Sequence, residues 1–202
     1  MNQIMKRGGD DQEVEGMFRT PQVLSKSYTS TVLDLYLDSE IGSPDKYREI
    51  YHALSNAGHQ DYIVLHVNSV GGRMDAGLQI INHIRNCKAK VVGVLHVECA
   101  SMASAILLAC DEWEINDFST MMIHSCSYGA IGKQSDVHNR VQFTTKFNEK
   151  FIRKNYTGFL SEEEIQKVLE GADLYFYSDE ITKRLETFSE LRDKEDEEKV
   201  VE

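Results

Sequence analysis

The chain has 202 residues, a formal net charge of −11 and a hydrophobic fraction of 41%. A chain of this length can bury one well-packed core, so we expect a single domain. The negative charge and the lack of a Lys/Arg cluster argue against a nucleic-acid partner. The sequence holds no apolar run of membrane-spanning length and no apolar signal segment near its start, so we expect a cytoplasmic protein without a membrane partner.

Cysteine usage argues against disulfides and zinc. The four cysteines form no Cys-x-x-Cys pair, and they are Cys87, Cys99, Cys110 and Cys126. In a chain without signs of secretion, this usage predicts free buried thiols. The same cysteine usage makes zinc improbable, so we expect no metal. The sequence also holds no phosphate-binding loop, and we expect no cofactor.

The first half of the chain predicts an arm, a strand and a helix. Residues 1–28 are polar and without a sustained period, which predicts a mobile arm. Residues 31–38 are rich in β-forming residues and predict a strand. A helix is expected from Ser43 as N-cap, with Pro44 in its first position, to Gly58. The apolar residues of this helix fall on one face, toward the core: Tyr47, Ile50, Tyr51 and Leu54.

Strands and helices then alternate, which predicts a parallel sheet with helices packed on it. The strands are expected at residues 62–67, 90–97 and 120–123, and the helices at 74–84 and 101–109. The near-continuous apolar run at residues 62–67 is typical of a strand that is covered on both faces.

Two more helices and a tail follow. A long helix is expected over residues 136–156, and Ser161 with Glu164 forms a capping-box pattern for a shorter helix that ends at Gly171. Residues 189–202 are acidic and poor in apolar residues, which predicts a frayed tail. The expected organisation is an arm at 1–28, one domain at 29–188 and a tail at 189–202.

Ser101 stands where a strand passes into a helix. It could simply be an N-cap, or it could be a nucleophile, since the free N–H groups of a first helical turn stabilise a developing oxyanion. The neighbouring Cys99 and Ser104 are interpreted as core residues.

Three further features lie near predicted strand ends. Gly71 and Gly72 follow a strand, and His124 ends a strand at the same sheet edge as Ser101. Asp173 precedes the aromatic run at residues 174–177, which is expected to bury the carboxylate partly. Taken singly, they are compatible with an ordinary turn, a packed or surface histidine, and a turn-forming aspartate.

Together these residues offer the chemistry of a hydrolytic triad. A serine hydroxyl becomes a good nucleophile when a neutral imidazole can take its proton, and a carboxylate orients that imidazole. Ser101, His124 and Asp173 suit these roles, and the N–H groups of Gly72 and Met102 suit an oxyanion hole.

The order of these motifs resembles the Clp peptidase family over roughly residues 30–185. The segments that carry the resemblance are Asn68-Ser69-Val70-Gly71-Gly72, Ala100-Ser101-Met102-Ala103, Met122-Ile123-His124, and Asp173 before Ser178-Asp179-Glu180. The resemblance implies a ClpP-like α/β spiral of strand–helix repeats, related to that of enoyl-CoA hydratases, with a protruding handle helix.

The same resemblance implies a mechanism and partners. Ser101 would be the nucleophile, His124 the base, Asp173 the orienting carboxylate, and Gly72 and Met102 the oxyanion donors. The segment from Tyr128 through Gly129, Ala130 and Ile131 to Gly132 would pair with an extended polypeptide substrate. The chain would form a homo-oligomer of heptameric rings, which can stack into a tetradecamer, and a Clp-type ATPase unfoldase would control access.

The sequence also departs from the family pattern. Val70 replaces a proline, Glu98-Cys99 replaces a Gly-Gln pair, and Ser125-Cys126 replaces a Gln-Pro pair. These departures identify a divergent member and leave substrate preference open. The family's axial-loop sequence is not recognisable near the N-terminus, which leaves docking to a Clp ATPase open. A phage head-maturation peptidase, a catalytically silent ring subunit and an acyl-CoA-binding protein of the same spiral fold remain the alternatives.

Overall fold

The computed structural model describes residues 29–201, so the arm expected at residues 1–28 lies outside the described part of the chain. The strands are β1 (Val32–Leu37), β2 (Tyr62–Ser69), β3 (Lys90–Ala100), β4 (Glu112–Ile115), β5 (Thr120–Ile123) and β6 (Leu174–Tyr177). The helices are η1 (Pro44–Tyr47, a 3-10 turn), α1 (Arg48–Asn56), α2 (Met74–Arg85), α3 (Met102–Leu108), α4 (Gln134–Tyr156), α5 (Glu162–Leu169) and α6 (Ser178–Val201).

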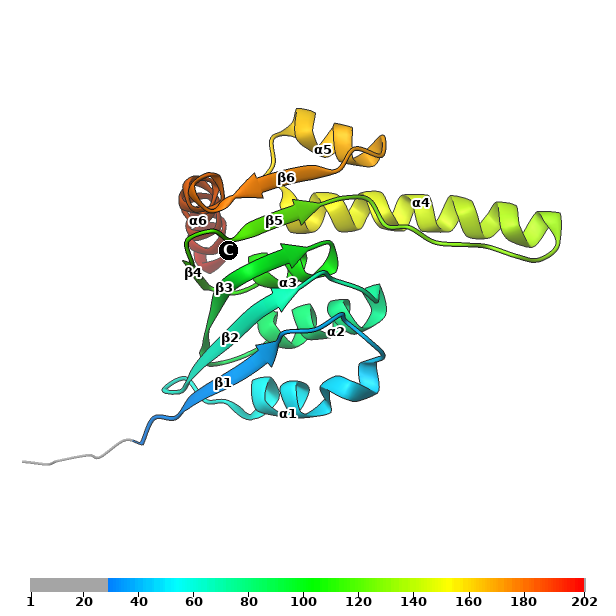
Figure 1. Cartoon of the computed structure of the whole chain (residues 1–202). Helices are drawn as coiled ribbons and strands as arrows, with labels where there is room; N and C mark the ends of the chain where they lie inside the picture. The colour runs from blue at the N-terminus through cyan, green and yellow to red at the C-terminus, as the bar shows by residue number, and fades with distance from the viewer. Residues whose placement is uncertain (1–28, 202) are drawn as a thin grey trace, which may run out of the picture.

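The strands form one sheet in the order β1-β2-β3-β5-β6, and β4 pairs with the first part of β3 (Figure 1). All pairings are parallel except that of β6, which runs antiparallel to β5. The predicted α/β fold with a parallel-rich sheet is therefore confirmed. The short strands β4 and β6 were not predicted, because four residues hold too little of a period to be distinguished from a loop.

Burial alternates along β2, so only one face of this strand is fully covered. Ile63, Leu65 and Val67 are buried, whereas Val64 and His66 between them remain partly exposed. The prediction that residues 62–67 are covered on both faces is wrong. An apolar run does not require that both faces be covered, because its side chains alternate across the sheet and the packed face takes only every second residue.

The first helical segment begins more tightly than expected. Pro44 opens a 3-10 turn, and the side chain of Ser43 makes no capping hydrogen bond. Tyr47, Tyr51 and Leu54 are buried as predicted from their spacing. In α5 the expected capping box is present: the Ser161 hydroxyl accepts from the Glu164 N–H, and the Glu164 carboxylate accepts from the Ser161 N–H.

The C-terminal segment is helical rather than frayed. α6 runs without a break from Ser178 to Val201, because residues 189–201 contain neither Gly nor Pro and are rich in helix formers. Phe188 is buried, and Arg192 donates to the main-chain oxygens of Leu108 (3.2 Å) and Cys110 (2.6 Å). The prediction of an unstructured tail from residue 189 is therefore wrong.

The four cysteines are free, as predicted, but only Cys99 and Cys110 are fully buried; Cys87 and Cys126 are half-buried. Ser104 is buried in α3, in agreement with its assignment to the core. Within residues 29–201, none of the helices is both long and apolar enough to cross a lipid bilayer.

Candidate active site

Ser101 occupies a sharp turn between β3 and α3. Its backbone has φ 55° and ψ −124°, a region that residues other than glycine rarely adopt and that costs about 1–3 kcal/mol. The Ser101 N–H donates to the Met122 carbonyl at 2.8 Å, which fixes the turn against β5. Ser101 holds the N-cap position of α3, but its side chain makes no capping bond. The turn directs the hydroxyl away from the helix.

His124 meets this hydroxyl. It follows β5 directly, and because β5 runs parallel to β3, both strands end at the same edge of the sheet. The distance from His124 Nε2 to Ser101 Oγ is 2.7 Å, well within hydrogen-bond range. A neutral imidazole with its proton on Nδ1 accepts the serine proton in this geometry.

Asp173 lies on the other side of the imidazole. It directly precedes β6, and the antiparallel pairing of Ile123 with Leu174 places it beside His124. Its Oδ1 is 3.8 Å from His124 Nδ1, which exceeds a hydrogen bond by a few tenths of an ångström. A modest approach of the carboxylate would close this pair.

Asp173 is partly buried, in agreement with the expectation, since only half of its side-chain surface is exposed. Strand alternation explains why the aromatic run leaves the other half open. Asp173, Tyr175 and Tyr177 share the more exposed face, whereas Phe176 between the two tyrosines packs into the core. Of the aromatic run, only Phe176 therefore faces the core, on the opposite side of the strand from Asp173.

Gly71 and Gly72 form the wall of the site next to Ser101. Both have positive φ, at 88° and 142°. A Cβ on Gly71 would lie 2.7 Å from Ser101 Cβ, so only glycine allows this approach. The Ile41 N–H donates to the Gly71 carbonyl and holds the loop in place.

The two expected oxyanion donors face the same cavity. Gly72 and Met102 line it together with Ser101 and His124. Among the described loop hydrogen bonds neither N–H has an acceptor, and Met102 is the first residue of α3, where N–H groups lack intrahelical partners. The two donors thus remain able to bind a developing oxyanion.

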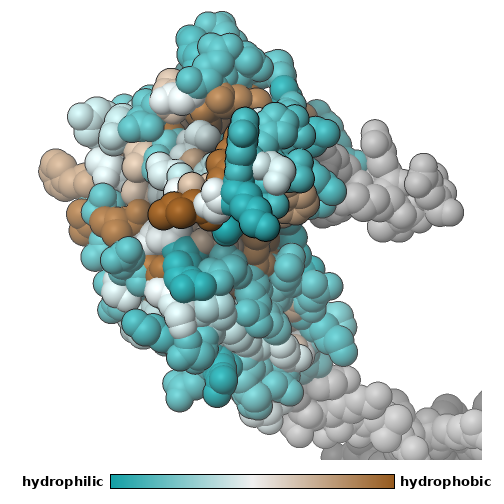
Figure 2. Space-filling model, turned by 90° about the vertical axis from the view of Figure 1, so that its right-hand side faces the viewer, coloured by the Kyte–Doolittle hydropathy of each residue, from teal (hydrophilic) through white to brown (hydrophobic). Residues whose placement is uncertain are grey.

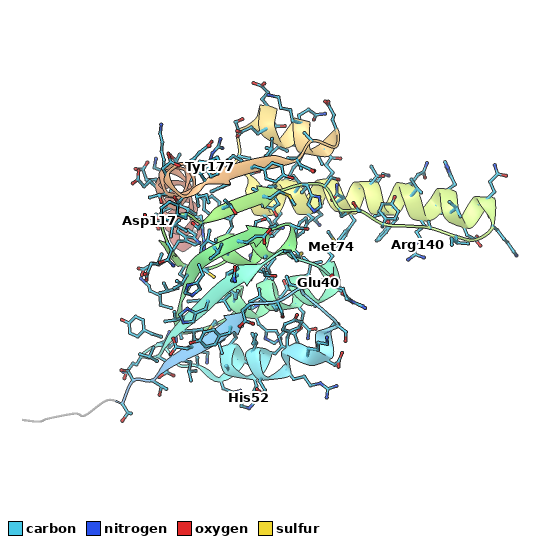
Figure 3. The ribbon with its side chains drawn as sticks, viewed as in Figure 1. Glu40, His52, Met74, Asp117, Arg140 and Tyr177 are labelled. Carbon is cyan, nitrogen blue, oxygen red and sulfur yellow. The ribbon has the colours of Figure 1, made fainter. Side chains whose placement is uncertain are left out.

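The cavity has a volume of about 410 Å³ and mixed chemistry. Its other lining side chains include Glu40, Arg73, Met74, Cys126, Ser127 and Phe151. In Figure 3, Glu40 and Met74 lie close together where the central strands end. Figure 2 views the molecule from this side and shows hydrophobic residues gathered in a band across a mainly hydrophilic face.

Cys126 and the following segment flank the cavity. Burial raises the pKa of the Cys126 thiol, which disfavours the reactive thiolate. The segment from Tyr128 to Gly132 belongs to no strand in the structure, and Tyr128 and Ile131 are exposed. This segment continues outward to α4 (Figure 1).

Two residues of the site carry no functional prediction from the sequence, Tyr156 and Asn148. Tyr156, the last residue of α4, lines the cavity, and its hydroxyl lies 2.9 Å from Ser104 Oγ. Burial raises the pKa of Tyr156 far above its usual range, so the phenol stays protonated. Asn148 accepts from the Cys126 N–H at 3.3 Å and donates to Ser125 Oγ at 2.9 Å. The only sequence signal for Asn148 is its spacing of three and four residues from Phe151 and Ile152, which places it on the same side of the helix.

No group of His, Cys, Asp or Glu side chains in the described part of the chain is arranged to hold a metal ion. The geometry instead presents a serine, a histidine and a carboxylate beside free backbone donors. A comparison with protein families shows that the family described as Clp protease matches residues 22–180. Since this match spans most of the sequence, the chain belongs to the Clp protease family.

Proposed function

We propose that the chain is a serine endopeptidase that cleaves unfolded polypeptides. Family membership implies a serine peptidase at a general level. The observation that carries the specific proposal is the 2.7 Å contact between His124 Nε2 and Ser101 Oγ, which is the contact a general base requires. In this proposal Asp173 orients His124.

The proposed reaction proceeds through an acyl-enzyme. His124 Nε2 takes the Ser101 proton as Oγ bonds to the substrate carbonyl carbon, and the carbonyl electrons move onto oxygen. The N–H groups of Gly72 and Met102 stabilise this oxyanion. His124 then gives its proton to the leaving amine, and a water molecule, activated by the same imidazole, hydrolyses the ester to release the acid.

Substrate binding is proposed to use the segment from Tyr128 to Gly132 as an added strand. The segment is not part of the sheet, and the exposure of Tyr128, Gly129 and Ile131 leaves it accessible. An extended polypeptide could pair its main chain with this segment while one side chain enters the 410 Å³ cavity. This mode fits an unfolded chain better than a folded one.

The quaternary proposal follows the family, whose members form ring oligomers. We propose homo-oligomeric heptameric rings, stacked into a tetradecamer, with a Clp-type ATPase as a candidate partner. The peptidase domain at residues 29–188 and a cytoplasmic location stay predictions.

Labelling with a serine-directed fluorophosphonate tests the nucleophile. We expect one adduct on the wild-type chain by intact mass, and none on Ser101→Ala or His124→Ala, because losing either group costs several orders of magnitude in rate. Ser127→Ala removes a cavity serine that has no proposed role in proton transfer and serves as the matched control. An adduct that persists on Ser101→Ala would refute the proposal.

A second candidate is a catalytically silent ring subunit. The 3.8 Å separation of His124 and Asp173, together with the exposure of Asp173, favours it, because an unoriented imidazole is a weak base. The labelling should therefore be performed on material whose assembly state is measured at the same time. An assembled ring that takes no label would favour this second function.

A further inference from the structure

The carbonyl group of Ser101 is held by buried polar groups from two helices. It accepts from Ser104 Oγ at 2.6 Å and from the Ser104 N–H at 3.1 Å. The Tyr156 hydroxyl lies 2.9 Å from Ser104 Oγ and 3.4 Å from the carbonyl oxygen. The side chains of Ser104 and Tyr156 are both essentially inaccessible to water.

The distances favour one order of donors and acceptors. A serine hydroxyl carries a single proton, and the 2.6 Å contact assigns that of Ser104 to the Ser101 carbonyl. Tyr156 then donates to its nearer acceptor, Ser104 Oγ at 2.9 Å, rather than to the carbonyl at 3.4 Å. Its protonated state agrees with this direction, because a buried phenol does not ionise near neutral pH. The hydrogen bonds therefore run in series from Tyr156 through Ser104 to the main-chain carbonyl of Ser101.

We infer that Tyr156 and Ser104 are positioning residues that hold the strained backbone of Ser101 in the conformation that presents its hydroxyl to His124. The inference rests on the proposed function. A residue other than glycine at φ 55° and ψ −124° persists only when its surroundings over-determine it. The Met122 carbonyl restrains the Ser101 N–H, and the hydrogen bonds from Ser104, supported by Tyr156, restrain the Ser101 carbonyl.

A helical serine often bonds to a carbonyl one turn earlier for purely local reasons. That account explains Ser104 but not Tyr156, which comes from α4 and is 55 residues away from Ser101 in the sequence. Tyr156 also lines the cavity beside Ser101. It thus links the base of α4 to the nucleophile turn, a connection that local helix geometry does not require.

The test measures the fluorophosphonate labelling rate of Ser101 in Tyr156→Phe, Ser104→Ala and the double variant, across pH and well below each melting temperature. We expect labelling to slow about ten-fold in Tyr156→Phe, the size of effect that loss of one hydrogen bond from the transition state produces. The midpoint of the pH profile should not move, because His124 is untouched. The double variant should be no slower than Ser104→Ala, since the two groups act in series.

Tyr51→Phe is the matched control. It removes another buried tyrosine hydroxyl, on α1, that has no hydrogen-bond partner among the described residues, and it should label at the wild-type rate. A Tyr156→Phe variant with a lower melting temperature but the wild-type labelling rate would overturn the inference. Losses in labelling rate that multiply in the double variant would overturn it as well. A wild-type chain that takes no label would instead contradict the proposed function, and this inference with it.

Discussion

At the scale of single residues, Gly71 shapes the site by having no side chain. Its φ of 88° favours glycine, and an added Cβ would lie 2.5 Å from the Ala100 carbonyl oxygen and 2.7 Å from Ser101 Cβ. These neighbours are the main chain and the side chain of Ser101, the proposed nucleophile, so neither can move without moving the turn. The loop that carries the proposed Gly72 donor depends on this contact.

Gly71→Ala is therefore expected to lower the free energy of unfolding by about 2–5 kcal/mol, the sum of backbone strain and overpacking. Gly171→Ala provides a control for strain alone, because its φ is 104° and a Cβ there meets nothing within 4 Å. The free energy of unfolding of Gly171→Ala should fall by about 1–2 kcal/mol. Urea denaturation of both variants checks the difference; equal losses would show that the overlap at Gly71 is relieved without cost.

The residues of the site differ in how well the sequence predicts them. Ser101 and His124 could be placed together, because the ends of parallel strands meet at one edge of a sheet, whereas Asp173 joined them only through triad chemistry and the order of the family motifs. Its position beside His124 depends on the antiparallel pairing of β6 with β5, and β6 is too short to be recognised from its period. Tyr156 was missed because its contact with Ser104 spans 52 residues, and apolar spacing alone marks it as a core side chain.

At the scale of elements, one guanidinium joins α5 to α6. Arg184 donates to both carboxylate oxygens of Glu164, at 2.7 and 2.9 Å, and to the Phe159 carbonyl at 3.0 Å. The hydrogen bonds from Arg184 hold the pKa of Glu164 at about 2, below its ordinary value of 4.5. Glu164 also closes the capping box of α5, so the start of one helix and the first turns of another share this pair.

The sign of the pH effect follows from the lowered pKa. The stabilisation that the Arg184–Glu164 pair gives the folded state is fully present above 4.5, the ordinary pKa of a Glu carboxyl, and is lost as the pH falls toward about 2. Glu164→Gln keeps a capping-box side chain but removes the charge, and we expect a loss of about 1–3 kcal/mol at neutral pH. Thermal unfolding as a function of pH should show that the variant and wild type converge in this acid range.

Glu163→Gln is the control for this experiment, because Glu163 forms an exposed pair with Lys167 on the same helix. Exposed pairs contribute little, so this variant should follow the wild type closely. If Glu164→Gln and Glu163→Gln had the same unfolding profile, the pair between α5 and α6 would not contribute to stability.

Elements with strong local signals were predicted from the sequence, and those that depend on distant partners were not. The capping box of α5 and the strand–helix alternation are local patterns. β4 needs the edge of β3, and the bonds from Arg192 to the carbonyls of Leu108 and Cys110 dock α6 against the body. The acidic, apolar-poor composition of residues 189–201 predicts a frayed tail, because it contains no signal for the contacts that α6 makes with the body.

At the scale of the whole molecule, α4 divides into a packed half and a projecting half (Figure 1). Phe151 and Ile152, near its end, are buried in the body. Phe143 and Phe147 stack with a centroid distance of 6.2 Å, and Phe143 is 70% exposed. Only the last turns of α4 reach the core of the same chain.

Exposed aromatic side chains on a projecting helix indicate a surface that another molecule covers. Under the ring proposal this molecule is a second copy of the chain. Phe143→Gln removes the aromatic ring but keeps a good helix former, and it should shift the assembly toward smaller species because the apolar contact is lost. Sedimentation velocity measures the shift, and Gln142→Ala, a polar neighbour on the same helix, is the control. If both variants sedimented like the wild type, the projecting half of α4 would not be the assembly surface, and the uncovered face of β2 would become the next surface to test.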